Sequence, residues 1–148
     1  MRRIVIAAAA LGVVGFFTSL LAQVVVAAEA SAKVSAPPDR VVVMYFHRTQ
    51  RCPTCLKMGG YSEEAVKTGF AQDIKKGKVE FHYIDFQDQR NEALTNGYQV
   101  SGPTLIVAQV VDNKVKEYKN LTEMWTKVRD KAAFIEYVQS NVKDYQKK

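Results

Sequence analysis

Four segments of the chain have the hydrophobic pattern of β-strands. Val41–Phe46 is a continuous run of β-branched and aromatic residues, which is typical of a strand buried on both faces. Apolar and polar residues alternate over 79–86 and predict a second strand. The apolar run 104–111 predicts a third, and a turn at Asp112–Asn113 leads into a short fourth strand, Val115–Tyr118.

Apolar residues recur at helical spacing between these strands. Pro53 suits the first turn of a helix, which we expect to end at Gly59–Gly60 because glycine weakens a helix interior. Ser62 is then the expected N-terminal cap of a second helix that continues past Phe70. Two further helices are predicted over residues 88–97 and 131–142.

The predicted elements follow the order βαβαββα. Strands that alternate with helices favour parallel pairing of the first two strands, and the last two strands are close enough in sequence to form a hairpin. The sequence therefore predicts an α/β domain in which a central mixed sheet is flanked by helices.

The N-terminal residues have the pattern of an export signal. Arg2 and Arg3 precede an uncharged apolar run, Ile4–Leu21, and the small residues Val26–Ala28 follow it as signal peptidase requires. We expect residues 1–28 to be a signal peptide that is removed. The alternative is that residues 4–28 remain as an uncleaved membrane anchor.

The segment after this leader is a spacer by composition. Residues 29–39 are small, polar and proline-bearing, which is typical of a flexible linker. The folded domain is expected over residues 40–148.

Composition and charge are those of an ordinary globular domain. Hydrophobic residues make up 47% of the chain and charged residues 24%. From Glu29 onward there are 19 basic and 15 acidic residues, and no basic run is interleaved with aromatics, so we expect no nucleic-acid partner. No phosphate-binding loop, Ser-His-Asp set or paired-carboxylate motif is recognisable.

The chemistry resides in Cys52-Pro53-Thr54-Cys55. Two cysteines separated by two residues at the start of a helix can close a disulfide with little backbone movement. Unpaired N–H groups and the positive end of the helix dipole lower the pKa of the first thiol, and we expect Arg51 and Lys57 to add positive potential. Cys52 is then the expected nucleophile and Cys55 the resolving thiol, with no cofactor required.

Two other interpretations of the cysteine pair are open. The first is a static structural disulfide, which is common in exported domains, although so short a loop removes little entropy from the unfolded chain. The second is a metal site in which Cys52, Cys55 and His47 are ligands, although two cysteines are too few for a closed zinc site.

The domain resembles the thioredoxin superfamily over roughly residues 40–142. The resemblance rests on the strand Val41–Phe46, on Cys52-Pro53-Thr54-Cys55 and on Gly102-Pro103-Thr104-Leu105. It implies a thioredoxin-like fold in which Pro103 is a cis-proline that packs against the disulfide. Pro103 is therefore a further expected catalytic-site residue.

A narrower resemblance covers residues 45–57. This stretch is similar to a group of small exported bacterial proteins, the ArsF type, named for a nitrophenyl-compound nitroreductase subunit. No flavin or nicotinamide site is recognisable, so reduction of nitro groups by this chain is not inferred. Arg51 replaces the aromatic residue that thioredoxins carry before the first cysteine, and Met44 occupies the place of their buried acid.

The sequence thus predicts an exported thiol–disulfide oxidoreductase. Its partners would be protein thiols or disulfides, in the bacterial periplasm or another extracytoplasmic space, with a membrane involved only if the leader is uncleaved. The alternatives are a redox accessory or electron-relay subunit for one dedicated partner, and a small periplasmic metal-binding protein.

Export makes a prediction about the mature N-terminus. Protein recovered from its native host should begin near Glu29 or Ser31, because the small residues before Glu29 suit cleavage. Intact-mass measurement checks this. Full-length protein in the cytosol would contradict export, and a full-length membrane-held form would favour the anchor.

Overall fold

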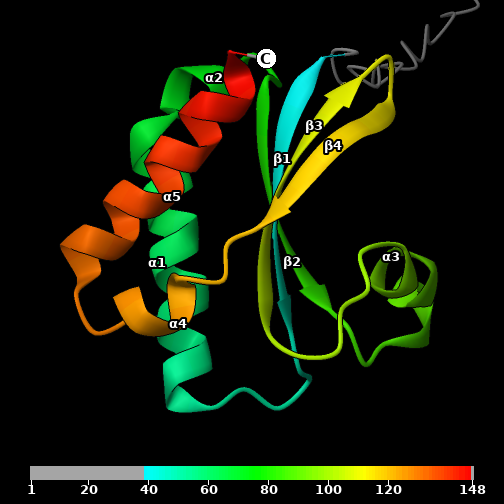
Figure 1. Cartoon of the computed structure of the whole chain (residues 1–148), viewed down its shortest axis with the longest axis vertical. Coiled ribbons are helices and arrows are strands. Elements are labelled where there is room, and N and C mark those ends of the chain that lie inside the picture. The colour runs from blue at the N-terminus through cyan, green and yellow to red at the C-terminus, as the bar shows by residue number, and fades with distance from the viewer. Residues whose placement is uncertain (1–38, 148) are drawn as a thin grey trace, which may run out of the picture. The chain divides into compact units, whose positions relative to one another are not determined.

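A four-stranded mixed sheet in the order β2-β1-β3-β4 organises the fold in a computed structural model, which describes residues 39–147 (Figure 1). The strands are β1 (Arg40–His47), β2 (Val79–Asp85), β3 (Thr104–Val111) and β4 (Lys114–Asn120). The expected signal peptide, and the expected spacer up to residue 38, lie outside the described residues.

The strand pairing follows the predicted connections. β1 pairs with β2 in parallel and with β3 in antiparallel, and β3 pairs with β4 in antiparallel. Asp112 and Asn113 both have positive φ, 49° and 59°, as the tight turn of the β3–β4 hairpin requires. The parallel pair is joined through a helical crossover, because parallel strands cannot be joined by a tight turn.

Helices cover both faces of this sheet. The two long helices are α1 (Pro53–Gly69) and α5 (Lys131–Gln146). The short elements are α2 (Ala71–Lys75), the 3-10 turn η1 (Gln89–Asn91), α3 (Glu92–Gly97) and α4 (Met124–Lys127). Figure 1 shows α1 and α5 on one face of the sheet and α3 on the other.

Successive residues of β1 enter two separate cores, as the fully apolar run predicted. Val43 and Tyr45 pack into the larger core with side chains of α1 and α5, and Met44 and Phe46 pack into a smaller core under the α3 region. The predicted fold class is confirmed: this is a mixed α/β domain compatible with a thioredoxin-like fold. Within residues 39–147, no helix has the length and apolarity needed to span a membrane.

The expected break in the first helix is wrong. α1 continues through Gly59 and Gly60, and Ser62 lies inside it, where its hydroxyl donates to the carbonyl of Met58 at 2.7 Å instead of capping a new helix. A Cβ on Gly59 would lie 2.9 Å from ring carbons of both Tyr45 and Tyr83. Gly59 therefore permits the close approach of α1 to the sheet.

The expected cis bond before Pro103 is also wrong. Every peptide bond in residues 39–147 is trans. The Thr104 hydroxyl donates to the Gly102 carbonyl at 2.9 Å, so the turn into β3 closes with the ordinary trans geometry.

The two adjacent glycines give a matched test of helix packing. Gly59→Ala should lower the free energy of unfolding by about 1–3 kcal/mol, because the new methyl group meets two aromatic rings. A Cβ on Gly60 meets nothing within 4 Å, so Gly60→Ala should be neutral or stabilising by up to about 1 kcal/mol. Urea denaturation of the oxidised protein checks both, and equal effects would contradict the close approach.

Candidate functional site

Cys52 and Cys55 form a disulfide at the N-terminus of α1, with their Cα atoms 5.0 Å apart. Cys52 is the N-cap residue of α1 and has an extended backbone, and Pro53 begins the helix, where its missing N–H costs nothing. The Cys52 Sγ accepts a hydrogen bond from the Cys55 backbone N–H at 3.1 Å. One sulfur therefore lies at the positive end of the helix.

The two cysteines differ in exposure. Cys52 is exposed, as are Pro53 and Thr54, whereas Cys55 is 7% exposed and belongs to the protein core. A molecule that approaches from solvent can therefore reach Cys52 more readily than Cys55.

Tyr45 contacts the first turn of α1 from the sheet. Its side chain is fully buried on β1, and its hydroxyl donates to the Cys55 carbonyl at 2.9 Å. Burial raises the pKa of Tyr45 to about 12, an effect that the charge of Arg51 partly opposes. The disulfide is thus attached to the sheet through a neutral tyrosine.

Arg51 turns back toward the sheet. Its Nη2 lies 2.7 Å from the His47 Nε2, and its guanidinium carbon lies 4.8 Å from the centre of the Tyr83 ring. Arg51 is half-buried in this arrangement. The contacts that fix Arg51 are therefore a hydrogen bond and a cation–π interaction.

These contacts determine the tautomer of His47. The ring is 7% exposed, and its Nδ1 lies 2.9 Å from the Arg48 carbonyl. A guanidinium only donates, so Nε2 must be the unprotonated acceptor and Nδ1 must carry the proton. The arrangement with Arg51 therefore requires a neutral His47.

Tyr83 connects this cluster to α1. Its hydroxyl donates to the Glu63 Oε2 at 3.0 Å, and the Glu63 carboxylate also pairs with Lys67 at 2.6 Å. Burial, followed by the hydrogen bond to Glu63, raises the pKa of Tyr83 to about 12. The Lys67 hydrogen bond helps to hold the pKa of Glu63 below its usual value.

The loop between β1 and α1 is tied to the end of β2. The Phe86 N–H donates to the His47 carbonyl at 3.0 Å, and the Thr49 N–H donates to the Gln87 side chain at 3.1 Å. The Arg48 guanidinium lies 5.9 Å from the centre of the Phe86 ring and is exposed. These bonds hold the loop that delivers Cys52.

Pro103 lies at the same end of the sheet as the cysteines. Thr104 pairs with Phe46, and the chain leaves β1 one residue later on its way to Cys52. Gly102 and Pro103 are half-buried, and a Cβ on Gly102 would meet nothing within 4 Å, so there is space for a side chain at Gly102. The catalytic role expected of Pro103 stays a prediction.

Lys57 is exposed on the first turns of α1, whereas Met44 is buried in the smaller core. No Asp or Glu side chain is buried in the described part of the chain. Within these residues, the Cys52–Cys55 pair therefore has no buried carboxylate beside it. The effects expected of Arg51 and Lys57 on the Cys52 thiol stay predictions.

The residues of the metal-site alternative make other contacts in this structure. Residues 39–147 contain no group of three or more His, Cys, Asp or Glu side chains placed to hold a metal ion. Both nitrogens of His47 are engaged, by Arg51 and by the Arg48 carbonyl. The alternative in which Cys52, Cys55 and His47 bind a metal stays a prediction.

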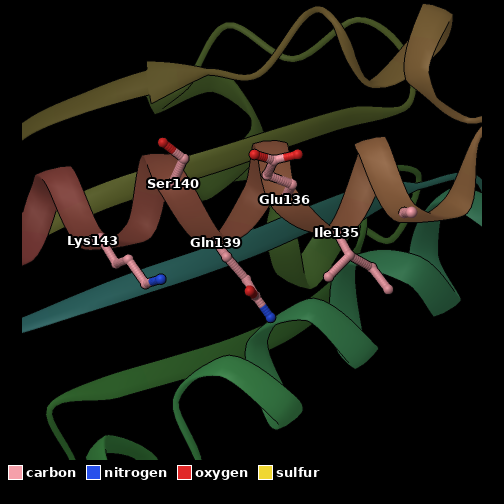
Figure 2. Close-up of a pocket in the computed structure, with 6 residues that line it drawn as sticks. Ile135, Glu136, Gln139, Ser140 and Lys143 are labelled. Atoms are coloured by element: carbon pink, nitrogen blue, oxygen red, sulfur yellow. The ribbon is translucent and has the colours of Figure 1, made fainter.

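Two pockets lie away from the disulfide. The first, of about 530 Å³, follows the outer surface of α5, where Gln139 extends toward α1 (Figure 2). The Gln139 amide already donates to the Ala65 carbonyl at 3.0 Å, so it serves helix packing. The second, of about 690 Å³, surrounds Arg40 and Gln109 at the other end of the sheet. Neither contains a cysteine.

No family model and no curated protein matches this chain. A solved structure entitled "Structure of a malarial protein" is 20% identical, with a TM-score of 0.37, over 60% of this chain and 96% of that one. We draw no conclusion about function from a similarity of this size.

Sequence reasoning found the cysteines and Arg51 but missed the cluster beneath them. Tyr45 and Tyr83 are adjacent partners in the β1–β2 register, and Gly59 lies above both. The signal was present as two aromatic residues at matching strand positions and a glycine in the facing helix. It could be interpreted only once the register was known.

The raised tyrosine pKa predicts how stability depends on alkaline pH. A group whose pKa is about 12 when folded and 10 when unfolded contributes stability that is complete below pH 10 and is lost as the pH rises to 12. Tyr45→Phe should therefore reduce the alkaline decline in unfolding free energy, by about 2 kcal/mol between these limits. Chemical denaturation at several pH values checks this, and an unchanged decline would contradict it.

Proposed function

We propose that this protein is an exported thiol–disulfide oxidoreductase. The observation that carries the proposal is the Cys52–Cys55 disulfide at a helix N-terminus, with one exposed and one buried sulfur. A disulfide in a small α/β domain is compatible with redox function and consistent with an extracytoplasmic location. A structural bridge would gain nothing from this difference in exposure.

The chemistry follows from the positions of the two sulfurs. In the reduced protein the exposed Cys52 is the nucleophile, because the helix N-terminus stabilises its thiolate. It attacks a partner disulfide and forms a mixed disulfide, and the partner's other sulfur leaves as a thiolate. Cys55 then attacks Cys52, which restores the Cys52–Cys55 bond and releases the reduced partner.

Access to Cys52 supports a protein partner. Cys52, Pro53 and Thr54 form an exposed surface, and there is space for a side chain at Gly102, before Pro103 at the same sheet end. We assign Pro103 to the wall of this site, next to the path of an approaching chain. The partner is a protein thiol or disulfide outside the cytoplasm, and the exchange itself needs no cofactor.

A more specific form of this proposal is thiol–disulfide exchange with one dedicated partner. The resemblance of residues 45–57 to the small exported ArsF-type proteins, and Arg51 in place of an aromatic residue, support a pair adapted to one partner. Insulin reduction would indicate broad exchange, whereas activity with one partner alone would indicate an accessory or electron-relay subunit.

Single cysteine variants test the proposed roles. With oxidised glutathione as the probe, reduced Cys55→Ser protein should form a stable mixed disulfide at Cys52, because the resolving thiol is missing. Reduced Cys52→Ser protein should react at least about tenfold more slowly, because Cys55 is buried. Mass spectrometry with peptide mapping measures both rates.

The two cysteine variants also show which result would contradict the proposed roles. If both variants react with oxidised glutathione equally slowly, and neither accumulates an adduct, the disulfide is a structural bridge. Circular dichroism of both variants establishes that each is folded before its rate is compared.

A further inference from the structure

We propose that Arg51, held in place by His47 and Tyr83, stabilises the reduced form of the cysteine pair and so makes it a stronger oxidant of partner dithiols. This inference rests on the proposed exchange function and adds the direction of exchange, which is oxidation of the partner. His47 is a positioning residue in this account, since it acts on the cysteines only through Arg51.

The position of Arg51 is the first part of the argument. Its guanidinium is fixed 2.7 Å from the His47 ring nitrogen and over the Tyr83 ring. Its charge acts on the buried Tyr45 hydroxyl, which lies 2.9 Å from the Cys55 carbonyl. The Tyr83 ring under Arg51 lies 6.1 Å from the Tyr45 ring, so the cation is held among the side chains that contact the first turn of α1, where water screens its charge less than on an open surface.

Two carboxylates lie near this charge, and among the described residues neither forms an ion pair with Arg51. Glu63 faces Tyr83 from α1, but its carboxylate is bound by Lys67. Asp85 faces His47 from β2 and is ionised, because hydrogen bonds from Thr49 and Gln87 hold its pKa below the usual value, so its charge partly opposes that of Arg51. Arg51 makes its closest contacts with neutral rings.

A fixed cation favours one redox state. The disulfide carries no charge, whereas the reduced pair can carry a thiolate at Cys52. Positive charge near the sulfurs therefore stabilises the reduced state and leaves the disulfide state unaffected. A pair whose reduced form is stabilised has a higher reduction potential and accepts electrons more readily.

The oxidation of a partner dithiol balances without another reagent. One partner thiolate attacks the Sγ of Cys52, the Cys52–Cys55 bond breaks, and its electron pair leaves on Cys55, which takes up a proton. The second partner thiolate attacks the partner sulfur of the mixed disulfide, and Cys52 leaves as a thiolate. The partner loses two electrons and its thiol protons, and the cysteine pair gains two electrons.

His47 determines whether Arg51 stays in place. The hydrogen bond needs an unprotonated Nε2, so replacement by leucine removes the acceptor, whereas glutamine can both accept from Arg51 and donate to the Arg48 carbonyl. Tyr45 and Tyr83 also flank the His47 ring, at centroid distances of 6.3 and 5.9 Å. Both tyrosine rings are therefore neighbours of the imidazole.

The test is the equilibrium constant for reduction of the disulfide by glutathione, measured on the purified protein by thiol quenching and mass spectrometry. Arg51→Gln should lower this constant about tenfold, because the reduced state loses its cation. The matched control is Arg48→Gln, which removes the same charge from an exposed side chain over Phe86. It should change the constant less than about twofold.

A double-mutant cycle separates positioning from a structural effect. His47→Leu should lower the constant as Arg51→Gln does, the double variant should resemble Arg51→Gln alone, and His47→Gln should retain most of the wild-type value. Equal effects of Arg51→Gln and Arg48→Gln, or a higher constant in Arg51→Gln, would overturn the inference. Additive effects of the His47 and Arg51 substitutions would overturn the positioning role.

The two proposals fail in different ways. A wild-type pair that does not exchange with glutathione at all would refute the proposed function. If the wild-type pair exchanges but Arg51→Gln has the same equilibrium constant for reduction by glutathione, only the role of Arg51 in favouring the reduced form is refuted.

Discussion

The close approach of α1 to β1 is the constraint on which the site depends. Gly59 lies against the rings of Tyr45 and Tyr83, and any side chain there would push the helix outward. At this separation the Tyr45 hydroxyl reaches the Cys55 carbonyl, so the first turn of α1 is attached directly to the sheet. That attachment leaves Cys55 in the core and Cys52 at the surface. Packing of a helix on a sheet thereby gives the two sulfurs different environments.

The tyrosine rings beneath α1 also contact the charged side chains near the cysteines. Tyr83 provides a ring for Arg51 and a hydroxyl for Glu63, and His47 accepts from Arg51 at 2.7 Å. Arg51 thus contacts the His47 and Tyr83 rings, beside the tyrosine that donates to the Cys55 carbonyl. By sequence Met44 occupies the place of the buried acid of thioredoxins, but in the structure Met44 packs in the smaller core, on the face of the sheet away from α1. The β1 side chain that contacts the first turn of α1 is Tyr45, whose hydroxyl donates to the Cys55 carbonyl.

The elements of the fold were predictable because each has a strong local pattern. The apolar run of β1, the apolar run of β3 and the Asp112–Asn113 turn were all recognisable in the sequence. The break at Gly59–Gly60 was wrong because helix propensity is a weak preference that tertiary packing overrides. The cis bond before Pro103 came from the resemblance alone and was also wrong. The contacts of Arg51 depend on the β1–β2 register, which no local pattern specifies.

The central claim is that the helix N-terminus and the tyrosine-supported first turn make Cys52 a reactive thiol. Its most direct test is the titration of both thiols in the fully reduced protein. The thiolate absorbance is measured as a function of pH in the wild type and in each single cysteine variant. The account predicts that the pKa of Cys52 lies well below that of an ordinary cysteine thiol and that Cys55 titrates at higher pH. Two thiols that titrate together, at or above the ordinary value, would contradict it.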